Sequence, residues 1–102
     1  MGINDVFRAL SDPTRREVLR ILQSGDLSAG DIANRFPLAR STLSGHFNIL
    51  KQAGLIVTER QGTTIVYSLD TSALDEAVSA VMDLFGVGKN ERDNDNANHA
   101  ED

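Results

Sequence analysis

The organisation of this chain depends on one stretch, Arg40-Ser41-Thr42-Leu43-Ser44-Gly45-His46-Phe47-Asn48-Ile49-Leu50-Lys51-Gln52-Ala53-Gly54. On a helix, with about 100° between successive residues, Leu43, Phe47 and Leu50 share one apolar face. The opposite face has hydroxyl groups, amides and a glycine but no acid, with Arg40 and Lys51 near its ends. Hydroxyls and amides both donate and accept hydrogen bonds, whereas an acid would repel phosphates, so this face suits nucleic acid. The alternative is an ordinary solvated helix face.

The composition is that of a small globular protein. The chain has 102 residues, 40% of them hydrophobic, and no cysteine. Disulfides, thiolate metal sites and cysteine nucleophiles are therefore excluded, and one domain with a modest core is predicted. No apolar run approaches the roughly 20 residues that span a bilayer, and the first residues lack the basic and apolar regions of a signal peptide. A cytoplasmic protein is predicted.

The net charge of −5 is unevenly distributed along the chain. Residues 1–69 carry eight arginines and lysines against six acids, whereas residues 70–102 carry nine acids against Lys89 and Arg92. DNA affinity depends on a local basic surface, so the acidic total does not exclude DNA binding. The sequence divides into a domain over residues 1–86 and an acidic tail over residues 87–102, which has almost nothing to bury and is predicted to be disordered.

Three helices are predicted before the central stretch. The first follows from the helical spacing of Ile3, Val6, Phe7 and Leu10. The second opens at Ser11-Asp12-Pro13, which combines a capping side chain with a proline suited to the first helical position, and stops at Gly25. Ser28-Ala29-Gly30-Asp31 resembles a capping box and opens a third helix that runs through Phe36 until Pro37 stops it.

A helix-turn-helix followed by a β-hairpin is predicted next. The short third helix, a break at Pro37-Leu38-Ala39 and the helix over residues 40–53 have the helix-turn-helix order. Residues 55–58 and 64–69 are rich in β-branched side chains, with Gln61-Gly62 as the turn between them. The predicted fold class is thus mainly α with a small β-hairpin, a winged helix-turn-helix whose wing covers residues 57–69. Without that hairpin, an ordinary helical hairpin would be favoured.

A last helix is predicted after the wing. Residues 70–75 offer several capping side chains, and Leu74, Val78, Val81 and Phe85 recur at i, i+4, i+7 and i+11. This apolar stripe needs a partner, which is either its own domain or a second copy of the chain.

Several separated motifs resemble the ArsR/SmtB family of bacterial transcriptional repressors. They cover residues 9–16, 41–56, 60–62 and 67–69, and the resemblance extends over roughly residues 3–86. Residues 25–33 and 48–53 are most similar to the SdpR-like autorepressor subgroup. The resemblance implies a homodimer, formed through the first and last helices, that occupies an inverted-repeat operator and blocks transcription until an inducing signal releases it.

The predicted contact residues follow from this interpretation. Serines in the first turns of the helix would read base edges, Arg60 on the wing would contact a phosphate, and Arg40 would do either. Gly45 departs from the larger polar residue that is usual in the family, and either allows close approach to DNA or is tolerated drift. The predicted DNA contacts are Arg40, Ser41, Thr42, Ser44, Gly45, His46, Asn48, Lys51, Arg60 and Gln61. The predicted dimer contacts are Val6, Phe7, Leu74, Val78, Val81 and Phe85.

Metal sensing is not predicted, although the resembled family includes metal sensors. Where many members have a cysteine pair, this chain has Leu27-Ser28-Ala29-Gly30, and its last helix has no histidine. The two histidines, His46 and His99, are far apart in the sequence, and a metal site needs several convergent ligands. No cofactor is predicted, and the resemblance suggests control by a partner protein at the membrane, an anti-repressor, in place of a metal.

Catalysis is not predicted either. Ser41, Ser44 and His46 are close in sequence, but a helix at the surface supplies no pocket for a nucleophile and its base, and no phosphate-binding glycine motif occurs. The competing hypothesis is a winged-helix protein-interaction module without DNA binding, which the net negative charge favours. A gel shift with the protein's own promoter region separates the two hypotheses.

Overall fold

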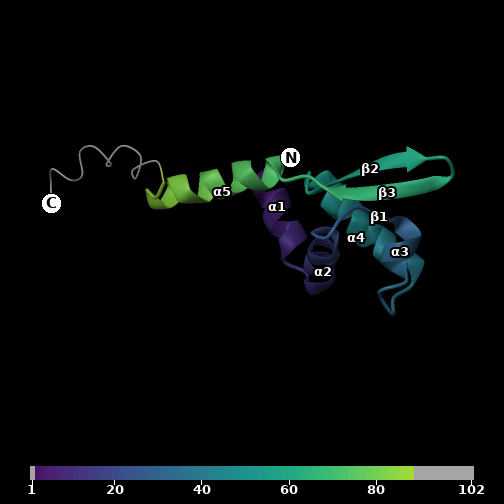
Figure 1. Cartoon of the computed structure of the whole chain (residues 1–102). Helices are drawn as coiled ribbons and strands as arrows, with labels where there is room; N and C mark the ends of the chain where they lie inside the picture. The colour runs from purple at the N-terminus through teal and green to yellow at the C-terminus, as the bar shows by residue number, and fades with distance from the viewer. Residues whose placement is uncertain (1, 89–102) are drawn as a thin grey trace, which may run out of the picture.

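The computed structural model describes residues 2–88, which form a mainly helical domain with a small sheet (Figure 1). The elements are α1 (Ile3–Leu10), α2 (Pro13–Leu22), β1 (Leu27–Ser28), α3 (Ala29–Ala33), α4 (Arg40–Gln52), β2 (Ile56–Gln61), β3 (Thr64–Leu69) and α5 (Ser72–Phe85). The sheet is antiparallel with the order β1-β3-β2, and the wing is the hairpin of β2 and β3. The order of these elements along the chain confirms the predicted winged helix-turn-helix.

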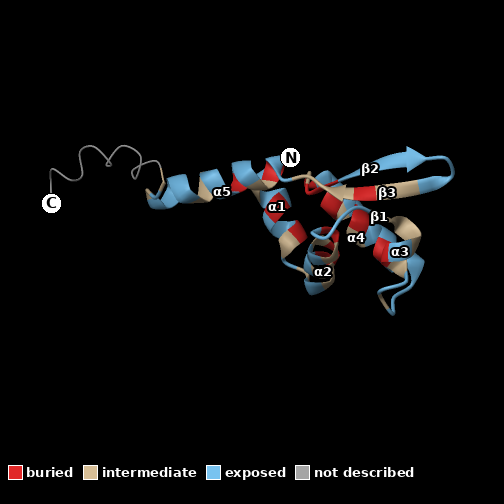
Figure 2. Cartoon of the chain, viewed as in Figure 1, coloured by how far each residue is buried: buried red, intermediate tan, exposed pale blue. Residues whose placement is uncertain are grey.

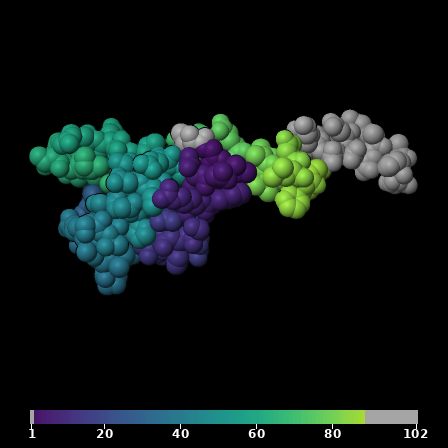
Figure 3. Space-filling model, turned by 180° about the vertical axis from the view of Figure 1, so that it is seen from behind, coloured from purple at the N-terminus to yellow at the C-terminus, as the bar shows by residue number. Residues whose placement is uncertain are grey.

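Two elements project from the domain in opposite directions. The tip of the wing extends beyond the helices on one side, and most of α5 extends on the other (Figures 1 and 3). Burial follows the same division, because the wing tip and the distal part of α5 are largely exposed (Figure 2). The region between these two projections contains the core. No helix among residues 2–88 is long and apolar enough to cross a membrane.

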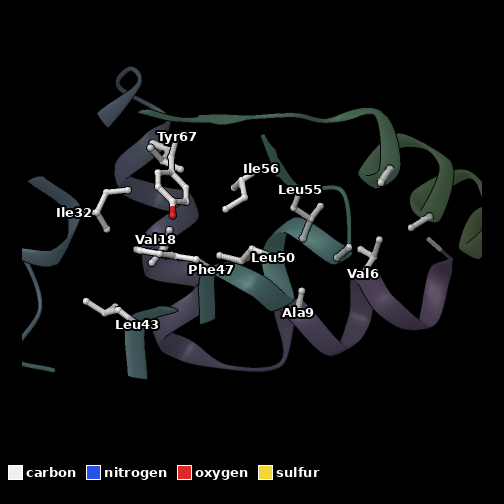
Figure 4. Close-up of a cluster of buried hydrophobic side chains, with 14 residues drawn as sticks. Val6, Ala9, Val18, Ile32, Leu43, Phe47, Leu50, Leu55, Ile56 and Tyr67 are labelled. Atoms are coloured by element: carbon white, nitrogen blue, oxygen red, sulfur yellow. The ribbon is translucent and has the colours of Figure 1, made fainter. Parts of the chain in front are cut away.

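The core is built around α4. Its side chains Leu43, Phe47 and Leu50 are buried, as the helical spacing predicted, and they meet apolar residues from every neighbouring element (Figure 4). The ring of Phe47 packs against that of Tyr67 on β3, with 4.7 Å between the ring centroids and an angle of 47° between the planes. Contacts along the whole apolar face therefore fix the orientation of α4 about its own axis.

The predicted third helix is too long. Helix α3 ends at Ala33, and two tighter turns follow, in which the amides of Arg35 and Phe36 donate to the carbonyls of Ile32 and Ala33. Because a proline disfavours helical geometry in the residue before it, Phe36 cannot continue the helix. The break before α4 is thus residues 34–39 and not only the tripeptide before Arg40.

The sheet differs from the prediction in three details. Strand β2 begins one residue later than predicted and continues to Gln61, which pairs with Thr64. The loop is therefore Gly62 and Thr63, and the positive φ of Gly62, 66°, suits the first position of a two-residue hairpin loop. Strand β1 was not predicted, because two residues are too few to give an alternating pattern.

The last helix begins and ends as its sequence indicates. The carboxylate of Asp70 accepts a hydrogen bond of 3.0 Å from the amide of Ser72, and Gly86 ends α5 in the left-handed conformation. The predicted disordered tail lies almost entirely outside the described residues, which stop at residue 88.

Asp12 caps α2 as predicted, with its carboxylate accepting from the amides of Thr14 at 2.8 Å and Arg15 at 3.2 Å. Partial burial raises the pKa of this carboxyl. The two backbone hydrogen bonds and the nearby His46 and Arg15 outweigh that effect, so the pKa of Asp12 lies below its usual range. The ionised carboxylate is thus the form that stabilises the fold.

Asp12→Ala should lower the free energy of unfolding by about 1 kcal/mol at neutral pH, because α2 loses its cap. A depressed pKa means that the stabilisation is complete above the ordinary value of 3.8 and is lost as the pH falls through the lower pKa of the folded state. The difference in the free energy of unfolding between wild type and Asp12→Ala, measured with urea, should therefore become smaller below about pH 4. Asp12→Asn is the control, since asparagine also caps helices and should cost less at neutral pH. A difference that widened on acidification would contradict this assignment.

Candidate nucleic-acid interface

The face of α4 opposite the core is open to solvent. Ser41, Thr42, Ser44, Gly45 and Asn48 are all exposed, and the apolar side chains of the same helix point into the core. Since these groups lie on one side of a helix whose other side is anchored, they form a rigid polar surface. The structure thus brings together the predicted contact residues of this helix, except that His46 lies at the edge of the core and is only partly exposed.

The charges on this helix favour an anion. Arg40 and Lys51 are exposed at its two ends, and neither makes an ion pair within residues 2–88. No acid lies on α4, and its N-cap residue, Ala39, has no side chain that could accept from the first amides. Unpaired cations and uncapped helix amides are the groups with which proteins bind phosphates.

Gly45 lies in the middle of the exposed face. Its φ is not positive, and a Cβ built there would meet no atom within 4 Å. Nothing in the fold therefore requires a glycine, although glycine in a helix interior costs about 1 kcal/mol relative to alanine. The missing side chain leaves bare backbone between Ser41, Ser44 and Asn48, which are its neighbours on the helix.

The wing carries the remaining two predicted DNA contacts. Arg60 and Gln61 are exposed at the end of β2, where Arg60 pairs with Ile65 across the hairpin and makes no ion pair within residues 2–88. Figure 3 shows the hairpin as a separate projection beside the helices. The tip of the wing is therefore open to solvent.

A buried arginine connects α2 with α4, and the sequence did not reveal this contact. Arg15 is only 8% exposed, and its guanidinium lies 3.1 Å from Nδ1 of His46. The two residues are 31 positions apart in the chain, so no local pattern links them. A signal was nevertheless present, since Arg15 precedes Val18 by three residues and therefore lies on the buried stripe of its helix.

The predicted dimer residues also come together. A groove of about 410 Å³ runs between α1 and α5 and is lined by apolar side chains, with Val6 almost fully buried at 1% exposure and Phe85 76% exposed. All six predicted residues line it: Val6, Phe7, Leu74, Val78, Val81 and Phe85. The apolar stripe of α5 is thus only partly covered by its own domain.

Within residues 2–88, no group of three histidine, aspartate or glutamate side chains could hold a metal ion. His46, the one histidine in that range, uses Nδ1 in its contact with Arg15. His99 lies outside the described residues.

Comparison with known proteins gives matches over most of the chain. Residues 10–59 match the model of a helix-turn-helix domain family. The transcriptional repressor SdpR of Bacillus subtilis is 44% identical over 89 residues, which cover 87% of this chain and 99% of that protein. The arsenical resistance operon repressor of Staphylococcus xylosus is 34% identical over 73 residues, which cover 72% of this chain and 70% of that protein.

The fold is likewise similar to solved structures. The crystal structure of an ArsR family transcriptional regulator superimposes with a TM-score of 0.75 at 28% identity, covering 81% of this chain and 91% of that one. These relatives are regulators of transcription, which confirms the prediction that the chain is not an enzyme. The chain belongs to the ArsR family of DNA-binding helix-turn-helix transcriptional regulators.

Proposed function

We propose that this regulator is a cytoplasmic homodimeric repressor that binds an inverted-repeat operator with α4 in the major groove and the wing along the flanking backbone. The observation that carries the proposal is the exposed face of α4, which is rigid, polar, free of acids and bounded by unpaired cations. Short hydroxyl and amide groups suit base edges, and the cations suit the phosphates beside them. A protein-interaction module would not need a face from which acids are absent.

Dimerisation through α1 and α5 is the second part of the proposal. The groove between α1 and α5 has three exposed apolar side chains, Phe7, Val78 and Phe85. Removing their apolar surface from water would be favourable in free energy. A second copy has the same apolar face on the same two helices. In a dimer with a two-fold axis at the groove, each copy would therefore cover the groove of the other. Such an axis would set the two α4 helices about one turn of DNA apart, which requires an operator with two related half-sites.

The target and the inducer are the remaining parts of the proposal. The similarity to SdpR, a repressor, supports repression of a promoter, and the protein's own promoter is the first to test. The donor groups of residues 2–88 do not support a metal as inducer. As the resemblance to the SdpR-like repressors implies, a protein partner is proposed as the releasing signal, and no small-molecule substrate is part of this proposal.

A residue that contacts base edges and a residue that contacts phosphates should respond differently to substitution. Ser44→Ala should erode discrimination between operator and scrambled DNA by about 1 to 3 kcal/mol, because Ser44 lies on the face that meets base edges. Arg60→Ala should weaken binding to both DNAs alike and lower the salt slope by roughly one unit, because a phosphate contact releases counterions without reading sequence. The measurement is the affinity for both DNAs across a salt series.

Wild-type protein is the reference for these titrations. If Ser44→Ala kept the ratio of operator to scrambled affinity while Arg60→Ala abolished it, the roles of helix and wing would be reversed. If the wild type retarded neither its own promoter nor any other DNA fragment, the interaction-module hypothesis would replace the proposal.

Val81→Glu should give monomers that no longer bind the operator, because the substitution places an unpaired charge in the interface and a single half-site binds too weakly. Sedimentation gives the oligomeric state, and a gel shift gives the binding. Ser79→Glu is the matched control, since Ser79 is exposed on α5 away from the groove and should leave the dimer intact. A Val81→Glu protein that remained dimeric would show that the dimer forms elsewhere.

Operator affinity should not change on treatment with EDTA or on addition of stoichiometric zinc. The chain has no thiol, and residues 2–88 have no convergent set of ligands. The relevant measurement is an operator titration with metal-free protein, repeated with each addition. A tenfold loss of affinity with zinc would show that carboxylates of α5, such as Asp75, form a metal site.

A further inference from the structure

The Arg15 side chain uses each of its three nitrogens in a contact between helices. Nε donates to the carbonyl of Ala9 at 2.8 Å, and Nη2 donates to the carbonyl of Arg8, also at 2.8 Å. These carbonyls belong to the last turn of α1, where the helix dipole favours a cation. Nη1 lies 3.1 Å from Nδ1 of His46 on α4. The guanidinium is thus buried, makes no ion pair with a carboxylate within residues 2–88, and joins the end of α1 to α4.

This contact determines which nitrogen of His46 carries the ring proton. A guanidinium can only donate, so in the neutral imidazole Nδ1 of His46 is the acceptor and carries no proton. The Asp12 carboxylate could compete by accepting from a protonated Nδ1, but its oxygen is 3.9 Å away, beyond hydrogen-bond distance. With Nδ1 held as an acceptor, the proton of the neutral ring lies on Nε2.

The other ring nitrogen reaches the surface. Nε2 has no hydrogen-bond partner within residues 2–88, and no buried side-chain nitrogen in that range lacks a partner, so Nε2 must be in contact with solvent. On α4, His46 lies on the flank between the buried stripe and the exposed polar face. Side chains on the flank of a helix in the major groove face the sugar-phosphate backbone that borders the groove, not the base edges.

We propose that Arg15 is a positioning residue for DNA binding, which holds the proton of His46 on Nε2 so that this nitrogen donates to an operator phosphate. The inference rests on the proposed function, because it needs α4 in the major groove. His46 would thus make an uncharged hydrogen bond to the DNA backbone. Such a contact carries no sequence information and releases no counterion. This distinguishes it from a phosphate contact made by arginine or lysine.

The first test is the ¹⁵N spectrum of the imidazole in the free protein, where the signal of His46 is the one that His46→Gln removes. Wild-type protein should show the proton on Nε2. Arg15→Lys should give a mixture of the two tautomers, because one ammonium group cannot reach all three acceptors. Arg16→Lys is the matched control, since Arg16 also donates to a carbonyl at the end of α1, that of Leu10, without contacting His46. It should leave the spectrum of His46 unchanged.

The second test compares two substitutions of His46 on DNA. Glutamine places an amide N–H near the position of Nε2, whereas asparagine places it near Nδ1 and lacks a donor at the surface. His46→Gln should bind three- to tenfold more tightly than His46→Asn, which is the effect of one neutral hydrogen bond. The ratio should be the same for operator and scrambled DNA, and the salt slopes of the two variants should be equal. Thermal unfolding of each variant checks that it is folded.

Three results would overturn the inference. A wild-type spectrum with the proton on Nδ1 would remove the role of Arg15, and equal affinities of the glutamine and asparagine variants would remove the contact of His46. A ratio that changed with DNA sequence would place His46 against a base. If wild-type protein bound no DNA, the proposed function would fail first, and the spectrum alone would then show whether Arg15 controls the tautomer.

Discussion

The burial of three side chains from α4 is the constraint on which the rest of the structure depends. Leu43, Phe47 and Leu50 lie in the core, and two of them are among its most completely buried side chains. A helix that is anchored along its whole length on one side must present the other side in a fixed orientation. The polar face of α4 is thus prearranged by the same contacts that stabilise the domain, and little rotational freedom is lost when it meets a partner.

Local charge explains how a protein with a net charge of −5 can be a DNA-binding regulator. Electrostatic interactions between exposed charges are screened beyond about 8 Å at physiological salt, so a cation on α4 acts mainly on groups close to it. Arg40 and Lys51 have no acid beside them on that helix, whereas three of the four acids within residues 70–88 lie on α5, which projects away from the wing (Figure 1). The acids of α5 are therefore kept apart from the face that should meet phosphates.

The sequence predicted those parts of the fold that depend on local patterns. Helix α4 was predictable from its apolar spacing, α2 from the cap and proline at Asp12-Pro13, and the wing from two runs of β-branched residues. Strand β1 was not predictable, because its two residues become a strand only by pairing with Tyr67 and Val66. The contact between Arg15 and His46 was missed for the same reason, since its partners come together only when α2 packs against α4.

The position of α1 connects the two surfaces that the proposed function requires. Its side chains Val6 and Phe7 line the groove where a second copy would pack, while the carbonyls at its end hold the guanidinium that contacts His46. Helix α1 is only eight residues long, too short to be stable alone, so its placement depends on its packing against the neighbouring helices and on these hydrogen bonds. Covering the groove would restrain α1, and α1 in turn restrains Arg15 against α4. The dimer would then contribute to DNA binding by more than bringing two half-sites together, because it would also steady the side chain that orients His46.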